Sequence, residues 1–150
     1  MESFKAICDG RLISLQEVSD PVFSEKMMGD GCAFLPSGKI VGAPLSGEVT
    51  MIYPTGHALG ITSDEGFEIL IHVGLNSFTL GDQAIRQCVK VGDRIAAGQQ
   101  LLEVDFDIFR ANNIDTVIPV VFTSGQRIEL SDISDVVMGQ DSIVTIYEKS

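Results

Sequence analysis

Glycine-containing turn signals interrupt this chain so often that little room remains for long helices. The sequence holds 15 glycines, and the turn signals recur about every 8–12 residues, a spacing typical of all-β domains. The signals include the dipeptides at 9–10, 37–38, 46–47, 92–93, 97–98 and 124–125 and the longer turns at 29–31 and 64–66. This punctuation predicts an all-β fold built from short strands.

The segments between the turns have the composition of strands, because branched aliphatic and aromatic residues dominate them. The predicted strands cover residues 40–42, 48–53, 58–62, 67–73, 101–104, 117–122 and 143–147. Helical periodicity is confined to two short pieces, at residues 21–26 and 107–112. No linker or low-complexity segment divides the chain, so residues 1–150 are predicted to form a single domain.

Length, composition and charge exclude several classes of protein. A chain of 150 residues with a hydrophobic content of 45% can build one core without disulfides or metal. The net charge of −11 repels nucleic acid and anionic membrane surfaces, so neither is expected as a partner. The apolar stretches are shorter than the roughly 20 residues of a membrane span. The N-terminus also lacks a basic segment leading into an apolar one. We therefore expect a cytoplasmic protein without direct membrane insertion.

The three cysteines do not form a recognisable framework. Cys8, Cys32 and Cys88 are widely spaced, odd in number and without a Cys-x-x-Cys pair. This pattern favours free thiols in a reducing compartment over a disulfide scaffold or a zinc knuckle. We expect the three side chains to act as small buried hydrophobic residues.

The only two histidines flank one predicted hairpin. Its strands are residues 58–62 and 67–72, and Gly66 suits a turn position with positive φ. A four-residue loop places His57 directly opposite His72, with their Cβ atoms about 4.5–5.5 Å apart. A three-residue loop shifts the register by one residue and makes the two histidines near neighbours instead. Either register brings both imidazoles to one level of the hairpin.

Alternation along the second strand predicts which way His72 points. Ile69, Ile71 and Val73 share one face, and this fully apolar face should pack on the core. His72 lies on the other face and is therefore expected to point toward the surface or a shallow cleft.

Two adjacent imidazoles can support phosphoryl transfer. A neutral imidazole is a nucleophile that forms covalent intermediates. Its neighbour can donate a hydrogen bond to the phosphoryl oxygens, where charge accumulates in the transition state. Thr55 lies two residues before His57, so its hydroxyl can orient that ring.

Zinc is the competing interpretation of the histidine pair. Structural zinc sites have four ligands and hydrolytic sites have at least three protein ligands. His57 and His72 supply only two, so a zinc hydrolase is not expected. Adventitious zinc, or zinc completed by a ligand from a partner protein, remains open.

Four segments together resemble one known family. They are DPVFSEKMMGDG at 20–31, APLSG at 43–47, TGHA at 55–58 and ILIHVGL at 69–75. The chain is similar over residues 18–124 to the glucose-family enzyme IIA domain of the bacterial phosphoenolpyruvate-dependent sugar phosphotransferase system. The resemblance implies an antiparallel β-sandwich of the barrel-sandwich hybrid type, with short helical pieces.

The resemblance also implies a function and a division of roles. His72 would accept a phosphoryl group on Nε2 from the phosphocarrier protein HPr and pass it to a cysteine of the enzyme IIB domain of a membrane sugar permease. His57 would stabilise the phosphoryl group, and Thr55 would hydrogen-bond His57. The chain would thus be a phosphotransferase with a phosphohistidine intermediate that requires no cofactor.

The resemblance further implies a docking surface around the histidines. Asp20 would form part of an acidic rim. An apolar ring would consist of Val22, Phe23, Met27, Met28, Tyr53 and Phe78. Asn76 belongs to the same rim but departs from the family, because many members have an acidic residue there. Residues 83–85 also replace the usual Gly-x-Gly-Phe. These differences leave the fit to HPr open.

A regulatory binding module is the alternative function. The same apolar ring would then dock onto metabolic enzymes or permeases, with phosphorylation as the switch. The two functions are compatible with each other. Neither the sugar nor the regulatory targets can be inferred from the residues.

Overall fold

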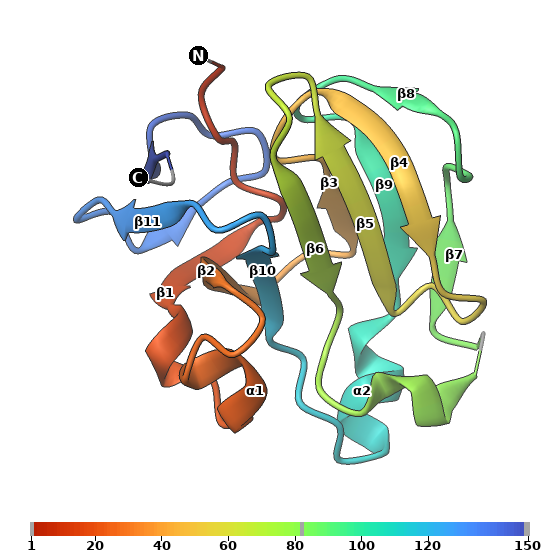
Figure 1. Ribbon diagram of the computed structural model, residues 1–150. Coiled ribbons are helices and arrows are strands. Elements are labelled where there is room, and N and C mark those ends of the chain that lie inside the picture. The colour runs from red at the N-terminus through yellow and green to blue at the C-terminus, as the bar shows by residue number, and fades with distance from the viewer. Residues whose placement is uncertain (1, 82, 149–150) are drawn as a thin grey trace.

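An eight-stranded antiparallel sheet forms the largest part of the molecule in a computed structural model, which describes residues 2–81 and 83–148. Figure 1 shows its central strands side by side. The strand order is β12 (Asp135–Val136), β1 (Gly10–Ser14), β2 (Asp30–Pro36), β10 (Ile118–Phe122), β6 (Glu68–His72), β5 (Ala58–Ser63), β4 (Gly47–Ile52) and β8 (Arg94–Ile95).

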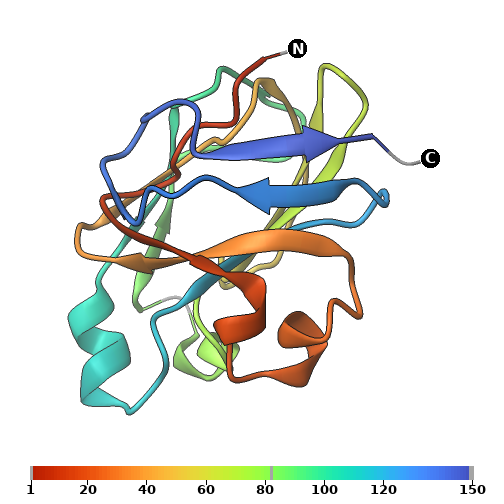
Figure 2. The ribbon, with the colours of Figure 1, turned by 90° about the vertical axis from the view of Figure 1, so that its left-hand side faces the viewer.

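Two smaller sheets complete the structure. One contains β3 (Ile40–Gly42), β9 (Gln100–Val104) and β7 (Ile85–Gln87). In Figure 1, β3 and β9 lie behind the β4–β6 part of the large sheet, and β7 lies at the edge beside β4. The other pairs β11 (Arg127–Leu130) with β13 (Val144–Tyr147), shown in blue in Figure 2. Every described strand pair is antiparallel. The predicted all-β sandwich is confirmed.

Among the described residues, four short helical pieces connect the strands. The two predicted ones are present as α1 (Pro21–Ser24) and α2 (Phe106–Ala111). Aspartates cap both: Asp20 accepts a hydrogen bond from the Val22 amide, and Asp105 accepts one from the Asp107 amide. Two 3-10 helices, η1 (Leu15–Glu17) and η2 (Ser77–Leu80), were not predicted, because single turns carry no periodic signal.

The predicted strands all exist. The bounds of β3 agree, and those of the other six differ by at most one residue at either end. The sequence prediction missed six strands: β1, β2, β7, β8, β11 and β12. β8 and β12 have two residues each and β7 has three, too few for an alternation to be visible. β2 contains small residues and ends at Pro36, yet it is a central strand buried on nearly all positions. Tertiary pairing with β1 and β10 outweighs its weak local propensity.

The core lies between the sheets. Its largest fully buried side chains include Phe34, Leu59, Ile71, Phe109 and Phe122. A second, smaller apolar cluster joins η1, α1, β2 and β10 on the other side of the large sheet, and it contains Ile13, Leu15, Val18, Phe23, Ala33, Leu75, Val117 and Val121. This second cluster attaches α1 to the sheet beside β6.

Two of the three cysteines behave as predicted. Cys8 and Cys32 are buried free thiols. Burial raises the pKa of Cys8 to about 12 and also raises the pKa of Cys32, so neither forms a thiolate at neutral pH. The prediction is wrong for Cys88, which is exposed. Cys88 directly follows the short edge strand β7, and its neighbour Val89 takes the inward position.

Candidate functional site

The β5–β6 hairpin has a three-residue loop, so its register follows the second of the two predicted alternatives. The Ser63 amide donates a 2.8 Å hydrogen bond to the Phe67 carbonyl, which extends the ladder to the end of β5. The Ser63 hydroxyl also accepts a hydrogen bond from the Phe67 amide. Residues 64–66 form the loop, with Gly66 at φ 91°. Ala58 rather than His57 therefore lies opposite His72. The predicted direct pairing of the histidines is wrong.

The two histidines are nevertheless neighbours. The carbonyl of His57, one residue before β5, accepts a hydrogen bond of 2.7 Å from the Val73 amide. The ring centroids of His57 and His72 lie 5.5 Å apart, in an edge-to-face arrangement. The shifted register thus brings the rings to one level of the hairpin, as both predicted alternatives required.

The faces of β6 follow the predicted alternation. Ile69, Ile71 and Val73 are buried in the core. His72 points to the other side and is half-buried, while the His57 side chain is 7% exposed. Both rings therefore sit on the outer face of the large sheet, partly shielded from water.

A backbone carbonyl holds the ring of His72. The distance between His72 Nδ1 and the carbonyl oxygen of Gly74 is 2.7 Å. Because a carbonyl oxygen can only accept a hydrogen bond, Nδ1 carries the proton in this contact. In the neutral ring the lone pair is then on Nε2, the nitrogen that a nucleophilic histidine would use.

Thr55 contacts the other ring. Its hydroxyl and Nδ1 of His57 are hydrogen-bond partners, as the sequence predicted. When the hydroxyl donates to Nδ1, the proton of the neutral His57 ring lies on Nε2. His57 then presents an N–H donor, the group that a phosphoryl oxygen needs.

Both imidazoles are shifted toward the neutral form. Burial lowers the pKa of His57 below 6.5, and the neighbouring His72 lowers it further. Burial also lowers the pKa of His72, although the Gly74 hydrogen bond and the Asp20 carboxylate act in the opposite direction. At neutral pH the site therefore holds two mostly uncharged rings.

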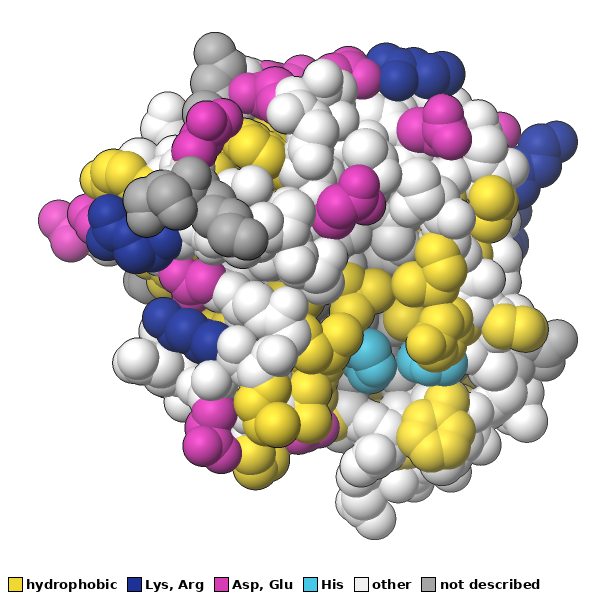
Figure 3. Space-filling model, viewed as in Figure 1, with side chains coloured by type: hydrophobic (Ala, Val, Ile, Leu, Met, Phe, Trp, Pro, Cys, Tyr) yellow, Lys and Arg dark blue, Asp and Glu magenta, His cyan; other side chains and the backbone are white. Residues whose placement is uncertain are grey.

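His72 borders a shallow cleft of about 520 Å³ on the outer face of β4, β5 and β6, and the His57 ring lies next to it. Figure 3 shows the two rings side by side in a hollow with apolar side chains around it. The lining residues are Asp20, Val22, Phe23, Met28, Thr50, Met51, Tyr53, Ala58, Gly60, Glu68, Ile69, Leu70, His72, Asn76, Phe78 and Thr123. The small residues Ala58 and Gly60 of β5 leave the floor of the cleft open.

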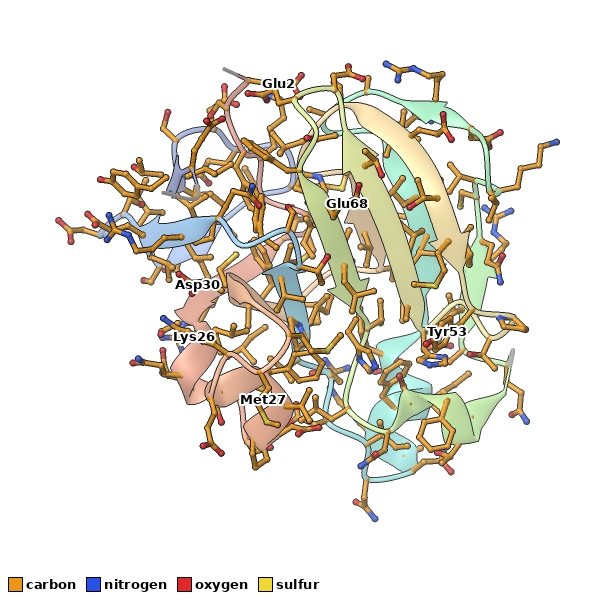
Figure 4. The ribbon with its side chains drawn as sticks, in the orientation of Figure 1. Glu2, Lys26, Met27, Asp30, Tyr53 and Glu68 are labelled. Atoms are coloured by element: carbon orange, nitrogen blue, oxygen red, sulfur yellow. The ribbon has the colours of Figure 1, made fainter. Side chains whose placement is uncertain are left out.

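Most residues predicted for the docking ring are exposed apolar side chains at this cleft. The exposed fraction is 70% for Met27, 56% for Phe78 and 48% for Tyr53, and Val22 and Met28 are also exposed. Figure 4 places Met27 beside α1 and Tyr53 at the β4–β5 connection. Tyr53 lines the cleft, and Met27 lies outside its lining. An apolar rim of this kind is typical of a protein interaction site.

Phe23 differs from the other predicted ring residues. It is only 4% exposed and belongs to the second apolar cluster. Its ring centroid lies 5.3 Å from that of His72, so Phe23 forms the wall of the cleft beside the histidine. Phe23 thus lies beside His72, as predicted for the ring, but α1 packs it against the sheet, and its role in docking stays a prediction.

The polar rim residues flank the histidine. Asp20 lines the cleft and caps α1 at the same time. Asn76 also lines the cleft, in a left-handed conformation with φ 61° that an asparagine tolerates well. The sequence interpretation missed the carbonyl of Gly74 as the partner of His72. The only signal for it was a glycine two residues after the histidine.

The histidine pair does not form a metal site by itself. Within residues 2–81 and 83–148, no three His, Cys, Asp or Glu side chains gather closely enough to hold a metal ion. Zinc with a third ligand from a partner protein stays a prediction.

Comparison with known proteins places this site in a family. Residues 2–128 match the model of the phosphoenolpyruvate-dependent sugar phosphotransferase system, EIIA 1. The chain belongs to this family. It is 36% identical over 148 residues to the PTS system glucose-specific EIIA component of Halalkalibacterium halodurans, which covers 97% of this chain and 86% of that protein.

A solved structure supports the same assignment. Glucose permease IIA from Mycoplasma capricolum superimposes with a TM-score of 0.88 at 34% identity, covering 95% of this chain and 94% of that one. The predicted β-sandwich fold and the predicted family are confirmed. Together the matches identify the chain as an EIIA member of the sugar phosphotransferase system family.

Some relatives are much longer than this chain. The PTS system glucose-specific EIICBA component of Staphylococcus saprophyticus is 41% identical over 144 residues, which are 94% of this chain and 21% of that protein. The EIICBA component of Streptococcus pneumoniae matches over 18% of its length. The chain thus spans about a fifth of these relatives. No helix in the described part of this chain is long and apolar enough to cross a membrane.

Proposed function

We propose that this domain accepts a phosphoryl group on Nε2 of His72 from the phosphocarrier protein HPr. It then passes the group to a cysteine of the enzyme IIB domain of a sugar permease. The single observation that carries the proposal is the 2.7 Å contact between His72 Nδ1 and the Gly74 carbonyl, which leaves Nε2 as the nucleophile. The proposed site of action is the cytoplasm.

Three features of the cleft support phosphoryl transfer on His72. The neutral ring has its nucleophilic nitrogen free at neutral pH, because burial lowers its pKa. His57 lies 5.5 Å away, centroid to centroid, and can donate a hydrogen bond to a phosphoryl oxygen. The shallow cleft admits a partner protein rather than enclosing a small substrate.

The transfer step requires little covalent chemistry from the protein. The lone pair of Nε2 forms a bond to phosphorus while the bond from phosphorus to the donor breaks. The charge on the equatorial oxygens is met by the N–H of His57. Onward transfer to the IIB cysteine reverses these roles, with Nε2 as the leaving group.

The surface around the histidines supports docking of two different partners in turn. Met27 and Met28 are flexible and polarisable, so they can fit more than one partner surface. The carboxylates of Asp20 and Glu68 line the same cleft, and basic side chains of a partner would pair with them. Asn76 supplies no charge, so HPr would dock without an acidic contact at that position.

The test of the proposal is labelling with phosphoenolpyruvate, enzyme I and HPr. Wild-type protein is expected to acquire an acid-labile phosphate, and His72→Gln is expected to acquire none. Equal labelling of both proteins would exclude His72 as the acceptor. Circular dichroism of both proteins serves as the control for folding.

The role of His57 has its own test. His57→Gln is expected to leave His72 able to accept the phosphoryl group but slow in passing it to the IIB cysteine, because the stabilising donor is lost. Onward transfer at the wild-type rate would remove His57 from the mechanism. Single-turnover measurement from phosphorylated domain to isolated IIB separates the two steps.

A further inference from the structure

Ser77 is a buried polar side chain that the transfer site does not use. It is 2% exposed and opens the 3-10 helix η2. Its hydroxyl donates a hydrogen bond to the carbonyl oxygen of Val73, four residues earlier. Any buried hydroxyl needs a hydrogen-bond partner. The partner of the Ser77 hydroxyl belongs to the turn that directly follows His72.

The backbone of that turn is held at two consecutive peptide groups. The first is the peptide group between Val73 and Gly74. Its carbonyl oxygen accepts the hydrogen bond from the Ser77 hydroxyl. Its amide, which belongs to Gly74, donates a 2.8 Å hydrogen bond to the Val117 carbonyl. The next peptide donates from the Leu75 amide to the carbonyl of Asp115, at 3.2 Å. The Gly74 carbonyl belongs to this second peptide and is thereby aimed at His72.

The turn cannot relax easily in another direction. Gly74 has φ 78°, and a Cβ atom built on it would lie 2.5 Å from Phe109 Cε2. Asn76 also has a positive φ of 61°. Glycine adopts such a conformation at no steric cost and asparagine tolerates it, so hydrogen bonds rather than backbone strain hold this turn in place. The Ser77 hydroxyl provides support from within the turn itself.

The orientation of the Gly74 carbonyl decides which nitrogen of His72 is protonated. With the carbonyl in place, Nδ1 is the donor and Nε2 has the lone pair. An imidazole without this partner is free to adopt either tautomer. A ring protonated on Nε2 presents a hydrogen instead of a lone pair to a phosphoryl donor in the cleft.

We infer that Ser77 is a positioning residue for His72. Its hydroxyl fixes the turn at Val73 and Gly74 so that the Gly74 carbonyl keeps the ring proton on Nδ1 and Nε2 remains the nucleophile. The consequence for catalysis rests on the proposed function, whereas the consequence for the tautomer does not.

The direct test is the tautomer of His72 in the unphosphorylated protein, read from ¹⁵N chemical shifts of the ring at a pH where the ring is neutral. Wild type is expected to be predominantly protonated on Nδ1. Ser77→Ala is expected to raise the ratio of the Nε2-protonated to the Nδ1-protonated form by about two- to tenfold, the effect of one hydrogen bond. Ser77→Thr, which keeps the hydroxyl, is expected to restore the wild-type ratio.

Ser63→Ala is the matched control. Ser63 is also buried, and its hydroxyl also makes one backbone hydrogen bond, at the far end of the same hairpin. This variant is expected to lose stability without a change of tautomer. The pair Ser77→Thr and Ser77→Val adds a comparison at constant shape, which decides the matter if the alanine variant folds poorly.

Phosphorylation kinetics provide the second readout. The kcat for phosphoryl acceptance from HPr should fall in Ser77→Ala by the factor by which the Nδ1-protonated fraction falls, with an unchanged KM, because the docking surface is intact. A wild-type tautomer ratio in Ser77→Ala, or an equal shift in Ser63→Ala, would overturn the inference. Failure of the proposed function is recognised separately, because wild-type protein would then take no label at His72.

Discussion

At the scale of single residues, the environment of His72 contains opposing effects on its pKa. Burial lowers the pKa below 6.5, and the Gly74 hydrogen bond and the Asp20 carboxylate raise it. Burial dominates, so the ring is mostly neutral near pH 7. A neutral ring is the form that can attack phosphorus.

Asp20→Asn should lower the pKa of His72 further, because it removes a carboxylate that favours the imidazolium. The acid limb of phosphoryl acceptance should then move to lower pH, since the ring stays neutral over a wider range. NMR titration of the His72 ring measures the shift. Glu25→Gln is the control, because it removes the same charge from a residue that does not line the cleft. A shift of equal size in both variants would contradict a local effect.

Thr55→Val should disturb His57 and leave His72 as it is. The variant has nearly the same shape but loses the hydroxyl that contacts Nδ1 of His57. Onward transfer should slow by about two- to tenfold, as expected for one hydrogen bond. Single-turnover transfer to the IIB domain is the measurement, and Thr55→Ser should retain most of the wild-type rate. A wild-type rate for the valine variant would show that the threonine does not act through His57.

At the scale of structural elements, the two ends of the β5–β6 hairpin require a glycine for different reasons. The loop end needs only a positive φ at Gly66, with nothing within 4 Å of an added Cβ. The histidine end needs both a positive φ and space at Gly74, where Phe109 blocks an added Cβ. The two glycines therefore offer a comparison between strain alone and strain with a clash.

Gly66→Ala should lower the free energy of unfolding by about 1–2 kcal/mol, the cost of a left-handed alanine, and leave phosphorylation unchanged. Gly74→Ala should displace the carbonyl that holds His72 and strongly reduce phosphoryl acceptance. Chemical denaturation and phosphorylation assays measure the two effects. Comparable loss of phosphorylation in both variants would contradict this division of the hairpin.

At the scale of the whole molecule, the two histidines link stability to pH. Both have pKa values lowered in the folded state, so the unfolded chain binds more protons just below pH 6.5. The free energy of unfolding must then rise with pH in this range. The stability that the two neutral histidines contribute is fully present above the unfolded pKa of about 6.5. It is lost as the pH falls through their lower pKa values in the folded state.

The free energy of unfolding should therefore fall between pH 7.5 and 5.5, as measured by urea denaturation at each pH. A variant with both His57→Gln and His72→Gln should show a smaller fall, because it lacks these two groups. An identical fall in the double variant would assign the pH dependence to other groups.

Much of this protein was predictable from local sequence patterns. The short spacing of turns indicated an all-β fold, the alternation along β6 gave the correct face of His72, and the Thr55–His57 spacing predicted their contact. These features depend on neighbours within a few residues, so their physical causes are visible in the sequence.

Only the tertiary structure decided the remaining features. The hairpin register is the one in which β5 also pairs with β4 and β6 also pairs with β10. The burial of Phe23 depended on how α1 packs against β2 and β10. The carbonyl partner of His72 depended on a turn held by Ser77 and by the segment at 115–117. Each involves the exact placement of groups from distant elements, which no local pattern encodes.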